Sequence, residues 1–269
     1  MSASGGGDGT VGKALEVLDI VSSFERPVRF SEIEERSAYP KATTYRLIQT
    51  LTNQRMLSFD PDMHTYAPGL RLVRMAHAAW TQSSLAPIAR PLLDELSLSV
   101  GETVHLAQLD HAQVLYVDKR NAKVPVEMYS QAGKVGPAYC TGVGKAMMAF
   151  LDEQALTNVI AQQSFHRFTE QTLCNDADIR AELADIRVRG FAFDREEHEP
   201  GIICVALPIL TRKHRVLGAL SITSTTNRNT LDDMAELAPI IRDTARRIAE
   251  VAEDWRFPDA GSQNQRTEI

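Results

Sequence analysis

The sequence predicts an α+β protein with two domains, and three observations lead to this fold class. The chain has 269 residues, of which 43% are hydrophobic, enough to form a core in each of two domains. Residues 11–68 combine helical periodicity with a single hairpin pattern. The longer remainder alternates strand-like runs joined by short turns with helical segments, which is typical of an antiparallel sheet with flanking helices.

Helical periodicity comes first along the chain. Leucine, isoleucine and valine recur three and four positions apart over residues 11–24, which predicts an amphipathic helix. Ser31 precedes a run of acids and is expected to cap a second helix that ends near Ser37. Pro40 suits the first position of a third helix. The inward face of that helix is expected to consist of Thr44, Leu47, Ile48 and Leu51.

A hairpin pattern follows the third helix. The segment MLSFDPDMHTYAPG contains two short apolar runs around Asp60, Pro61 and Asp62, as in a β-hairpin with a polar tip. Three helices followed by such a hairpin make a winged helix-turn-helix, which we expect over residues 10–69. The preceding residues 1–9 are rich in Gly and Ser without periodicity, and we expect them to be disordered.

A further helical segment leads into the second block. Residues 70–84 carry a stripe of apolar side chains and predict a linker helix. We expect a second domain over 85–255 and a disordered tail at 256–269. In the second domain, strands are expected at about 103–109, 113–118, 125–130, 202–210 and 216–223, and helices at about 87–99, 142–161, 176–189 and 230–254.

Composition and motif content exclude several classes of protein. No apolar run approaches the roughly 18 residues of a membrane span, and the first residues lack the pattern of a signal peptide, so we expect a cytoplasmic protein. Cys140, Cys174 and Cys204 are odd in number and far apart, which fits reduced thiols better than a disulfide framework or a metal site. Without GxSxG, HExxH, CxxC or Walker patterns, we expect no cofactor, no metal and no catalytic residue.

Charge is distributed unevenly along the chain. The net charge of −6 argues against a protein that coats nucleic acid through bulk electrostatics. Residues 1–84 hold nine basic and nine acidic residues, so the excess of acid lies in the rest. From Arg36 to Phe59 there are four basic residues and no acidic one. This pattern predicts that one defined surface docks on DNA, with specific contacts and dimerisation supplying the affinity.

The third helix has the side chains of a recognition helix. The N-terminal end of such a helix enters the major groove, where hydrogen-bonding side chains read base edges. Arg46 is expected to grip guanine through two hydrogen bonds, whereas Lys41 and Thr43 hold phosphate. Gln49 reads adenine or reaches only the backbone. The expected DNA-contacting residues are Lys41, Thr43, Thr44, Tyr45, Arg46 and Gln49.

The segment TGVGKA at 141–146 suggests a nucleotide loop but does not meet its requirements. The Walker pattern needs Gly at position 139 and Ser or Thr at position 146, where this chain has Tyr139 and Ala146. What remains is a glycine-rich helix start whose N–H groups can hold a carboxylate or carbonyl oxygen.

Four segments in a fixed order carry a family resemblance: GTVGKALEVLDIV, FSEIEERSAYPKATTYRLIQTL, GPAYCTGVGKAMMAF and FDREEHEPGIICVALPI. Together they resemble the IclR (isocitrate lyase regulator) family over residues 10–255. The resemblance implies a winged helix-turn-helix, a linker helix and an effector-binding domain with a GAF-like antiparallel sheet, assembled as a homodimer or a dimer of dimers. Gly142 departs from the Ala or Ser frequent in the family, which implies a larger or looser pocket.

The resemblance also implies where an effector binds. The expected effector-binding residues are Met128, Gly142, Val143, Asp194, Ile202, Cys204, Ser221 and Thr223. Met128 and Ile202 would form apolar walls, and Asp194 would accept a hydrogen bond from a hydroxyl or hydrated aldehyde. This chemistry suits a small carboxylate, keto acid, aldehyde acid or aromatic acid. The nearby charged loop 196–198 is either a solvated turn or a lid over the pocket.

These expectations combine into a homo-oligomeric transcription regulator. We expect a repressor that a small-molecule inducer releases from a pseudo-palindromic double-stranded operator. Such control requires two arrangements of the oligomer that the ligand binds unequally, coupled through the linker helix. A ligand-dependent activator with the same parts remains open. The competing class is a hydrolase that uses Cys140 or Cys204 as its nucleophile.

Overall fold

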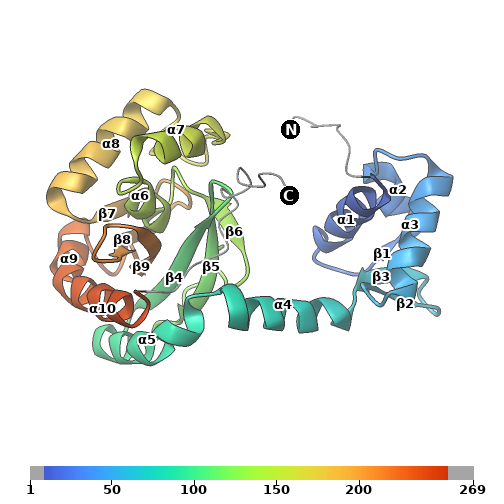
Figure 1. The fold of residues 1–269 in the computed structure, drawn as a ribbon, viewed down its shortest axis with the longest axis horizontal. Coiled ribbons are helices and arrows are strands. Elements are labelled where there is room, and N and C mark those ends of the chain that lie inside the picture. The colour runs from blue at the N-terminus through green and yellow to red at the C-terminus, as the bar shows by residue number, and fades with distance from the viewer. Residues whose placement is uncertain (1–8, 254–269) are drawn as a thin grey trace, which may run out of the picture. The chain divides into compact units, whose positions relative to one another are not determined.

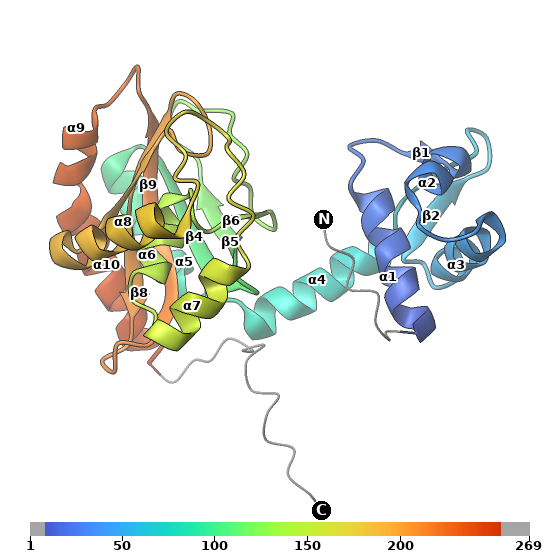
Figure 2. The same cartoon turned by 90° about the horizontal axis from the view of Figure 1, so that it is seen from above.

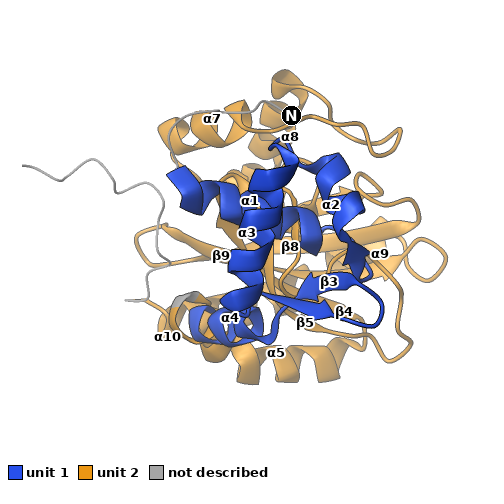
Figure 3. Cartoon of the chain, turned by 90° about the vertical axis from the view of Figure 1, so that its right-hand side faces the viewer, with its two compact units in different colours: residues 1–79 blue, residues 80–269 orange. Residues whose placement is uncertain are grey.

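The computed structural model describes residues 9–253, which form two compact units (Figures 1 and 3). The first unit ends at Ala79 and the second begins at Trp80, so the boundary falls within the predicted linker helix. The two segments expected to be disordered lie outside the described residues, except that Gly9 begins the first helix.

The first unit is a winged helix-turn-helix, as predicted. Its elements are α1 (Gly9–Ser22), β1 (Val28–Arg29), α2 (Phe30–Arg36), α3 (Lys41–Asn53), β2 (Leu57–Asp60) and β3 (Thr65–Pro68). The three strands form an antiparallel sheet in the order β1-β3-β2, in which β1 is an addition to the predicted hairpin. Apolar side chains from all three helices and the sheet share one core, which includes Val17, Val21, Ile33, Ile48 and Leu57.

Helix α2 begins differently from the sequence prediction. Ser31 is predicted as its cap, but the helix already starts at Phe30, because the preceding residue Arg29 is still paired with Thr65 in the sheet. The Glu32 carboxylate accepts the backbone N–H of Arg29 at 2.9 Å. An acidic side chain in the first turn, and not Ser31, therefore satisfies a backbone N–H group at the start of α2.

Local hydrogen bonds hold two turns of the first unit. Pro40 precedes α3 instead of forming its first residue, and its carbonyl accepts the N–H of Thr43 at 2.8 Å. At the tip of the hairpin, Asp60 Oδ1 accepts the N–H groups of Asp62 at 2.9 Å and Met63 at 3.1 Å. A backbone carbonyl thus closes the first of these turns, and an aspartate side chain that binds the backbone locally shapes the second.

Helix α4 (Leu70–Ser83) confirms the predicted linker helix. Its N-terminal part belongs to the first unit, and Trp80 packs against a core of the second. Leu70, Val73 and Met75 are exposed although they are large and apolar.

The second unit is built on a six-stranded antiparallel sheet in the order β6-β5-β4-β9-β8-β7. The strands are β4 (Thr103–Asp110), β5 (Gln113–Arg120), β6 (Val135–Pro137), β7 (Ala192–Arg195), β8 (Ile202–Leu210) and β9 (Val216–Thr225). Helices α5 (Ala86–Val100), α9 (Leu231–Glu236) and α10 (Ala238–Val251) cover one face, and α6 (Gly142–Met148), α7 (Glu153–Ala161) and α8 (Asp176–Arg189) lie on the other (Figures 1 and 2).

Alternate residues of the central strands pack into two separate hydrophobic cores, one on each face of the sheet. In β8, Val205 and Leu207 face α5 and α10, whereas Cys204 and Ala206 face α6. The α6 side of the sheet carries small side chains, including Ala219 of β9. Small residues let α6 approach the sheet closely and leave space beside its first turn.

Several predicted boundaries are wrong in this unit. No strand forms at 125–130, because this segment starts at Pro125 and is held by side chains instead of a backbone ladder. The edge strands β6 and β7 are not predicted. The helix predicted at 142–161 is two helices, the second capped by Asp152, whose Oδ1 accepts the N–H of Ala155 at 2.8 Å. The last helix also divides, at Leu237, just before Pro239 in the first turn of α10.

Within residues 9–253, no helix is both long and apolar enough to cross a membrane.

Candidate functional sites

The N-terminal half of α3 exposes hydrogen-bonding side chains. Lys41, Tyr45 and Arg46 are exposed, and Thr43 is half-buried. Lys41 forms an ion pair with Glu34 at 3.2 Å on the surface. Across residues 9–253, no hydrogen bond or ion pair holds the guanidinium of Arg46. This side chain is therefore the one most available to an incoming partner.

Thr44 and Gln49 are placed differently. Thr44 is fully buried, with its hydroxyl 2.9 Å from Ser37 Oγ and donating to the Tyr39 carbonyl at 3.3 Å. Its side chain ties α3 to the preceding turn and does not reach the surface, which corrects its place among the expected DNA contacts. Gln49 is half-buried, one turn further along the same helix.

A small cavity lies on the α6 side of the sheet in the second unit. Seven of the eight expected effector-binding residues line it: Gly142, Val143, Asp194, Ile202, Cys204, Ser221 and Thr223. Met128 is buried but is not part of the lining. The structure thus brings together residues from β7, β8, β9 and the start of α6.

The sheet wall of the cavity is polar and centred on His105 of β4. Ser130 Oγ lies 2.9 Å from His105 Nε2, and Thr223 Oγ1 and Ser221 Oγ lie 3.2 Å and 3.4 Å from Nδ1. Burial, aided by the positive charge of Lys119, lowers the pKa of His105 to about 3. The imidazole is therefore neutral at physiological pH, with one ring nitrogen as donor and the other as acceptor.

Asp194 faces the cavity from β7, where it pairs with Cys204 of β8. Its Oδ1 accepts the backbone N–H of Glu197 at 2.8 Å. Burial, together with the negative charge of Glu197, raises the pKa of Asp194 to about 7, although Lys145 acts in the opposite direction. Near neutral pH this carboxyl group can therefore donate or accept a hydrogen bond.

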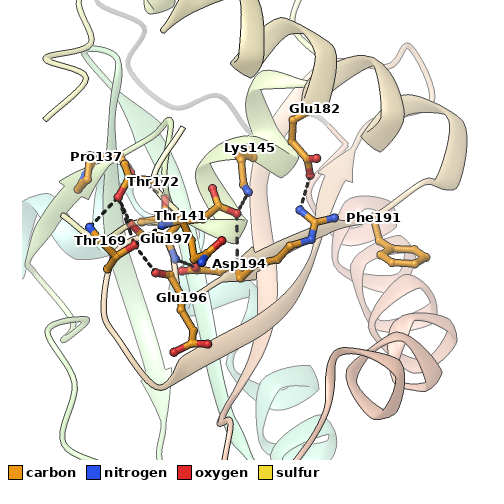
Figure 4. A network of polar contacts seen from close by, with 12 residues as sticks. Pro137, Thr141, Lys145, Thr169, Thr172, Glu182, Phe191, Asp194, Glu196 and Glu197 are labelled. Atoms are coloured by element: carbon orange, nitrogen blue, oxygen red, sulfur yellow. Dashed lines mark hydrogen bonds and ion pairs between the residues drawn. The ribbon is translucent and has the colours of Figure 1, made fainter. Parts of the chain in front are cut away.

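A buried ion pair lies behind Asp194 (Figure 4). The Lys145 ammonium of α6 binds Glu197 Oε1, and the two side chains are 0% and 2% exposed. Thr172 Oγ1 donates to the Glu197 carbonyl at 2.7 Å, which fixes the loop from the other side. The interpretation of residues 196–198 as a solvated turn is wrong for Glu197, because its carboxylate is an internal partner of α6.

His198 and Glu199 of the same loop also line the cavity. The ring of His198 contacts the rings of Tyr129 and Phe168, with centroids 5.3 Å and 4.7 Å apart. Glu199 accepts the backbone N–H of Tyr129 at 3.0 Å. Three segments distant in sequence therefore meet beside this part of the lining, and the lid alternative stays a prediction.

Gly142 and Cys204 limit the size of the cavity. A Cβ atom at Gly142 would lie 2.3 Å from Cys204 Sγ, so the glycine is required by the close approach of the thiol. The cavity volume is about 30 Å³, and one water molecule needs roughly 10–15 Å³. A ligand of several heavy atoms therefore requires movement of lining side chains.

The thiols are poor nucleophile candidates in this setting. Cys140 and Cys204 are buried, and burial together with the negative charge of Asp194 raises the pKa of both thiols well above the usual range. A thiol of this kind is protonated at neutral pH, whereas the nucleophile of a hydrolase is the thiolate. Among residues 9–253, no cluster of His, Cys, Asp and Glu has the arrangement of a metal site.

Comparison with known proteins identifies the family. The model described as "Bacterial transcriptional regulator IclR C-terminal" matches residues 77–250, and the "IclR helix-turn-helix domain" model matches residues 10–61. The chain belongs to the IclR family. It is accordingly a transcriptional regulator with a DNA-binding helix-turn-helix, and the family resemblance of the sequence is confirmed.

Individual IclR-family proteins align over most of both chains. The HTH-type transcriptional regulator XynR of Escherichia coli K12 is 32% identical over 229 residues, 85% of this chain and 90% of XynR. The transcriptional repressor IclR of the same strain is 26% identical and covers 88% of this chain and 87% of its own. The crystal structure of an IclR homolog complexed with 4-hydroxybenzoate, from Microbacterium hydrocarbonoxydans, covers 91% of this chain and 99% of its own with a TM-score of 0.76. At 21% identity this last likeness shows the fold alone.

Sequence reasoning missed part of the cavity lining in this IclR-family protein. The additional lining residues are His105, Tyr116, Ser130, Thr141, His198 and Glu199. One signal was available for the first of them. His105 interrupts an apolar strand on the same face as Ser221, its partner in the register. Side chains that alternate toward one face of a sheet meet there, so the pairing of these two strands would have pointed to the histidine.

Proposed function

We propose that this regulator is a repressor that binds operator DNA through α3 and is released when a small organic acid occupies the cavity of its second unit. The observation that carries the DNA contact is the exposed N-terminal half of α3, where Lys41, Tyr45 and Arg46 stand without an acidic neighbour on the same helix. Arg46 supplies the base contact, since a guanidinium can bind both acceptors of guanine in the major groove.

Lys41 and Thr43 hold phosphate in this proposal. Lys41 must exchange its exposed pair with Glu34, at 3.2 Å, for a phosphate oxygen. An ion pair on the surface contributes little, so this exchange has a small cost. Gln49, half-buried one turn further along α3, reads adenine or reaches only the DNA backbone.

The effector proposal rests on the seven expected residues that share one cavity. We assign to it a small carboxylate, keto acid, aldehyde acid or aromatic acid. The 4-hydroxybenzoate in the crystal of the Microbacterium hydrocarbonoxydans homolog belongs to that class. Helix α4 is the segment that joins the two units, and the effector acts by favouring one of two arrangements of the oligomer.

The proposal also covers the oligomeric state, the cellular location and the sign of regulation. A homodimer or dimer of dimers places two copies of α3 on a pseudo-palindromic site, because a symmetric protein matches a symmetric operator. The protein acts in the cytoplasm, where it meets double-stranded DNA. The name of the Escherichia coli repressor IclR favours repression over activation.

The experiment selects binding sites from random double-stranded DNA with the purified full chain and measures affinity by fluorescence anisotropy. Arg46→Ala should lower affinity by about 1–3 kcal/mol and relax the preference at one base position. Arg74→Ala on α4, an exposed arginine outside α3, serves as the matched control. Equal losses for both variants would refute the role of Arg46. A promoter reporter with the selected site then separates repression from activation.

A further inference from the structure

The cavity has an unusual balance of charge for a site that binds an organic acid. Among the described residues that line it there is no lysine and no arginine, while Asp194 and Glu199 contribute two carboxyl groups. Lys145 lies close by but is bound to Glu197. Lys119 donates to the Ser130 carbonyl at 2.9 Å. A ligand carboxylate would therefore meet carboxyl groups and no free ammonium or guanidinium.

The lining instead supplies carboxyl groups, which accept hydrogen bonds, and hydroxyl groups, which both accept and donate them. Asp194 uses Oδ1 for the Glu197 amide, and the Glu199 carboxylate is held by the Tyr129 amide. Each carboxyl group has further lone pairs, since a carboxylate offers about four acceptor positions. These positions favour a ligand that donates hydrogen bonds.

The side chains around His105 can both donate and accept hydrogen bonds. His105 is neutral and bonded at one nitrogen to Ser130 and at the other to Thr223 or Ser221. Whichever nitrogen carries the proton, at least one of these hydroxyls accepts from the ring and can turn its own hydrogen toward the cavity. Only Val143 and Ile202, of the described lining side chains, are aliphatic.

We infer that the effector is a small polyhydroxylated compound, bound through hydroxyl groups that donate to Asp194 and Glu199 and accept from the hydroxyls around His105. This inference rests on the proposed function of the cavity as the effector site. It selects the hydroxylated members of the organic-acid class and makes the hydroxyl groups, more than the carboxylate, the determinants of recognition. A ligand hydroxyl group suits both sets of lining side chains, because it donates and accepts at once.

The test uses ligands that differ only in hydroxyl number. Propionate, lactate and glycerate share three carbons and one carboxylate, and butyrate and threonate extend the series by one carbon. Affinities for the full chain are measured by calorimetry and by thermal shift. A hydrogen bond to a charged group contributes about 1.5–3 kcal/mol, so each added hydroxyl should raise affinity at least about tenfold. Pyruvate and 4-hydroxybenzoate are the comparison probes.

Two conservative variants locate the contacts. Asp194→Asn and Glu199→Gln should each lower the affinity for threonate at least about tenfold and flatten the dependence on hydroxyl number. Both keep a carbonyl oxygen for the backbone N–H that the carboxylate accepts, so operator binding without ligand should remain and report the fold. Glu236→Gln, an exposed acid on α9, is the matched control and should leave the series unchanged.

The outcomes separate this inference from the proposed function. Tighter binding of pyruvate or 4-hydroxybenzoate than of glycerate and threonate, or an affinity that does not change with hydroxyl number, overturns the inference and leaves an organic-acid effector in place. No response to any probe, with operator binding intact, overturns both the inference and the effector role of the cavity. The DNA-binding proposal survives either result.

Discussion

Separating Lys145 from Glu197 should destabilise the second unit strongly. The two side chains are 0% and 2% exposed, the ammonium binds Glu197 Oε1, and among the described residues Glu197 Oε2 has no hydrogen-bond partner. Removing one member of a buried ion pair costs about 3–5 kcal/mol, because the remaining charge is left uncompensated in a medium that solvates it poorly. For a unit of this size the melting temperature should fall by roughly 6–20 °C.

The two single variants should differ in their pH dependence. Lys145→Met leaves Glu197 and Asp194 as neighbouring buried carboxyl groups without an ammonium beside them. Its loss of stability should be larger at pH 8 than at pH 5, where Asp194, whose pKa is raised to about 7, is protonated. Glu197→Gln leaves an isolated ammonium instead. The double variant Lys145→Met/Glu197→Met removes both charges and should be more stable than either single variant.

Thermal and urea unfolding of the full chain, followed by circular dichroism, gives the coupling energy of this double-mutant cycle. Arg246→Met is the matched control, since it removes a cation whose pairs with Asp243 and Glu250 are on the surface of α10, and it should change the melting temperature little. If the double variant lost the sum of the single effects, or if Lys145→Met melted like Arg246→Met, the reasoning would be refuted.

Further predictions concern individual buried groups. The pKa of Asp194 is raised to about 7, so its contribution to stability is present below about pH 4 and is lost as pH rises toward 7. The pKa of His105 is lowered to about 3, so its contribution is present above about pH 6.5 and is lost as pH falls. Relative to the wild type, Asp194→Asn should therefore gain stability with rising pH and His105→Gln should lose it; unchanged slopes in urea titrations would contradict this. Thr44→Val should destabilise the first unit by about 1–3 kcal/mol while operator affinity of the folded protein stays within twofold of wild type, about 0.4 kcal/mol. In native protein, iodoacetamide should label Cys174 faster than the two buried thiols, as peptide mass spectrometry would show.

Local patterns were sufficient for the first unit. Its helices are short, amphipathic and separated by clear turn residues, so the periodicity of residues 11–24 and the polar tip at Asp60 identify the winged helix-turn-helix. The error at Ser31 arose because β1 extends to Arg29 only through its pairing with β3, a contact made 36 residues along the chain at Thr65. The secondary-structure propensities of neighbouring residues cannot reveal a pairing partner so far along the chain.

The cavity was predictable only in part. Residues such as Asp194 and Thr223 were expected through the family resemblance, and in the structure both line the same cavity. Glu197 was not recognised as buried, because its neighbours in sequence are charged and its partner Lys145 lies 52 positions away. The segment at 125–130 has the alternation of a strand, yet its buried members Met128 and Ser130 belong to no sheet, and Ser130 instead lines the cavity beside His105.

The close approach of Gly142 to Cys204 imposes an order on evolutionary change. A methyl group at position 142 overlaps the thiol at 2.3 Å, while the next neighbour, Ala206 Cβ, would be at 3.4 Å. Cys204→Ala removes the overlapping atom, so Gly142→Ala then fits without movement, whereas before that change it requires the Cys204 side chain to reorient. The history of these two positions is therefore epistatic, and lineages that carry alanine at the first position should carry a small or reoriented side chain at the second.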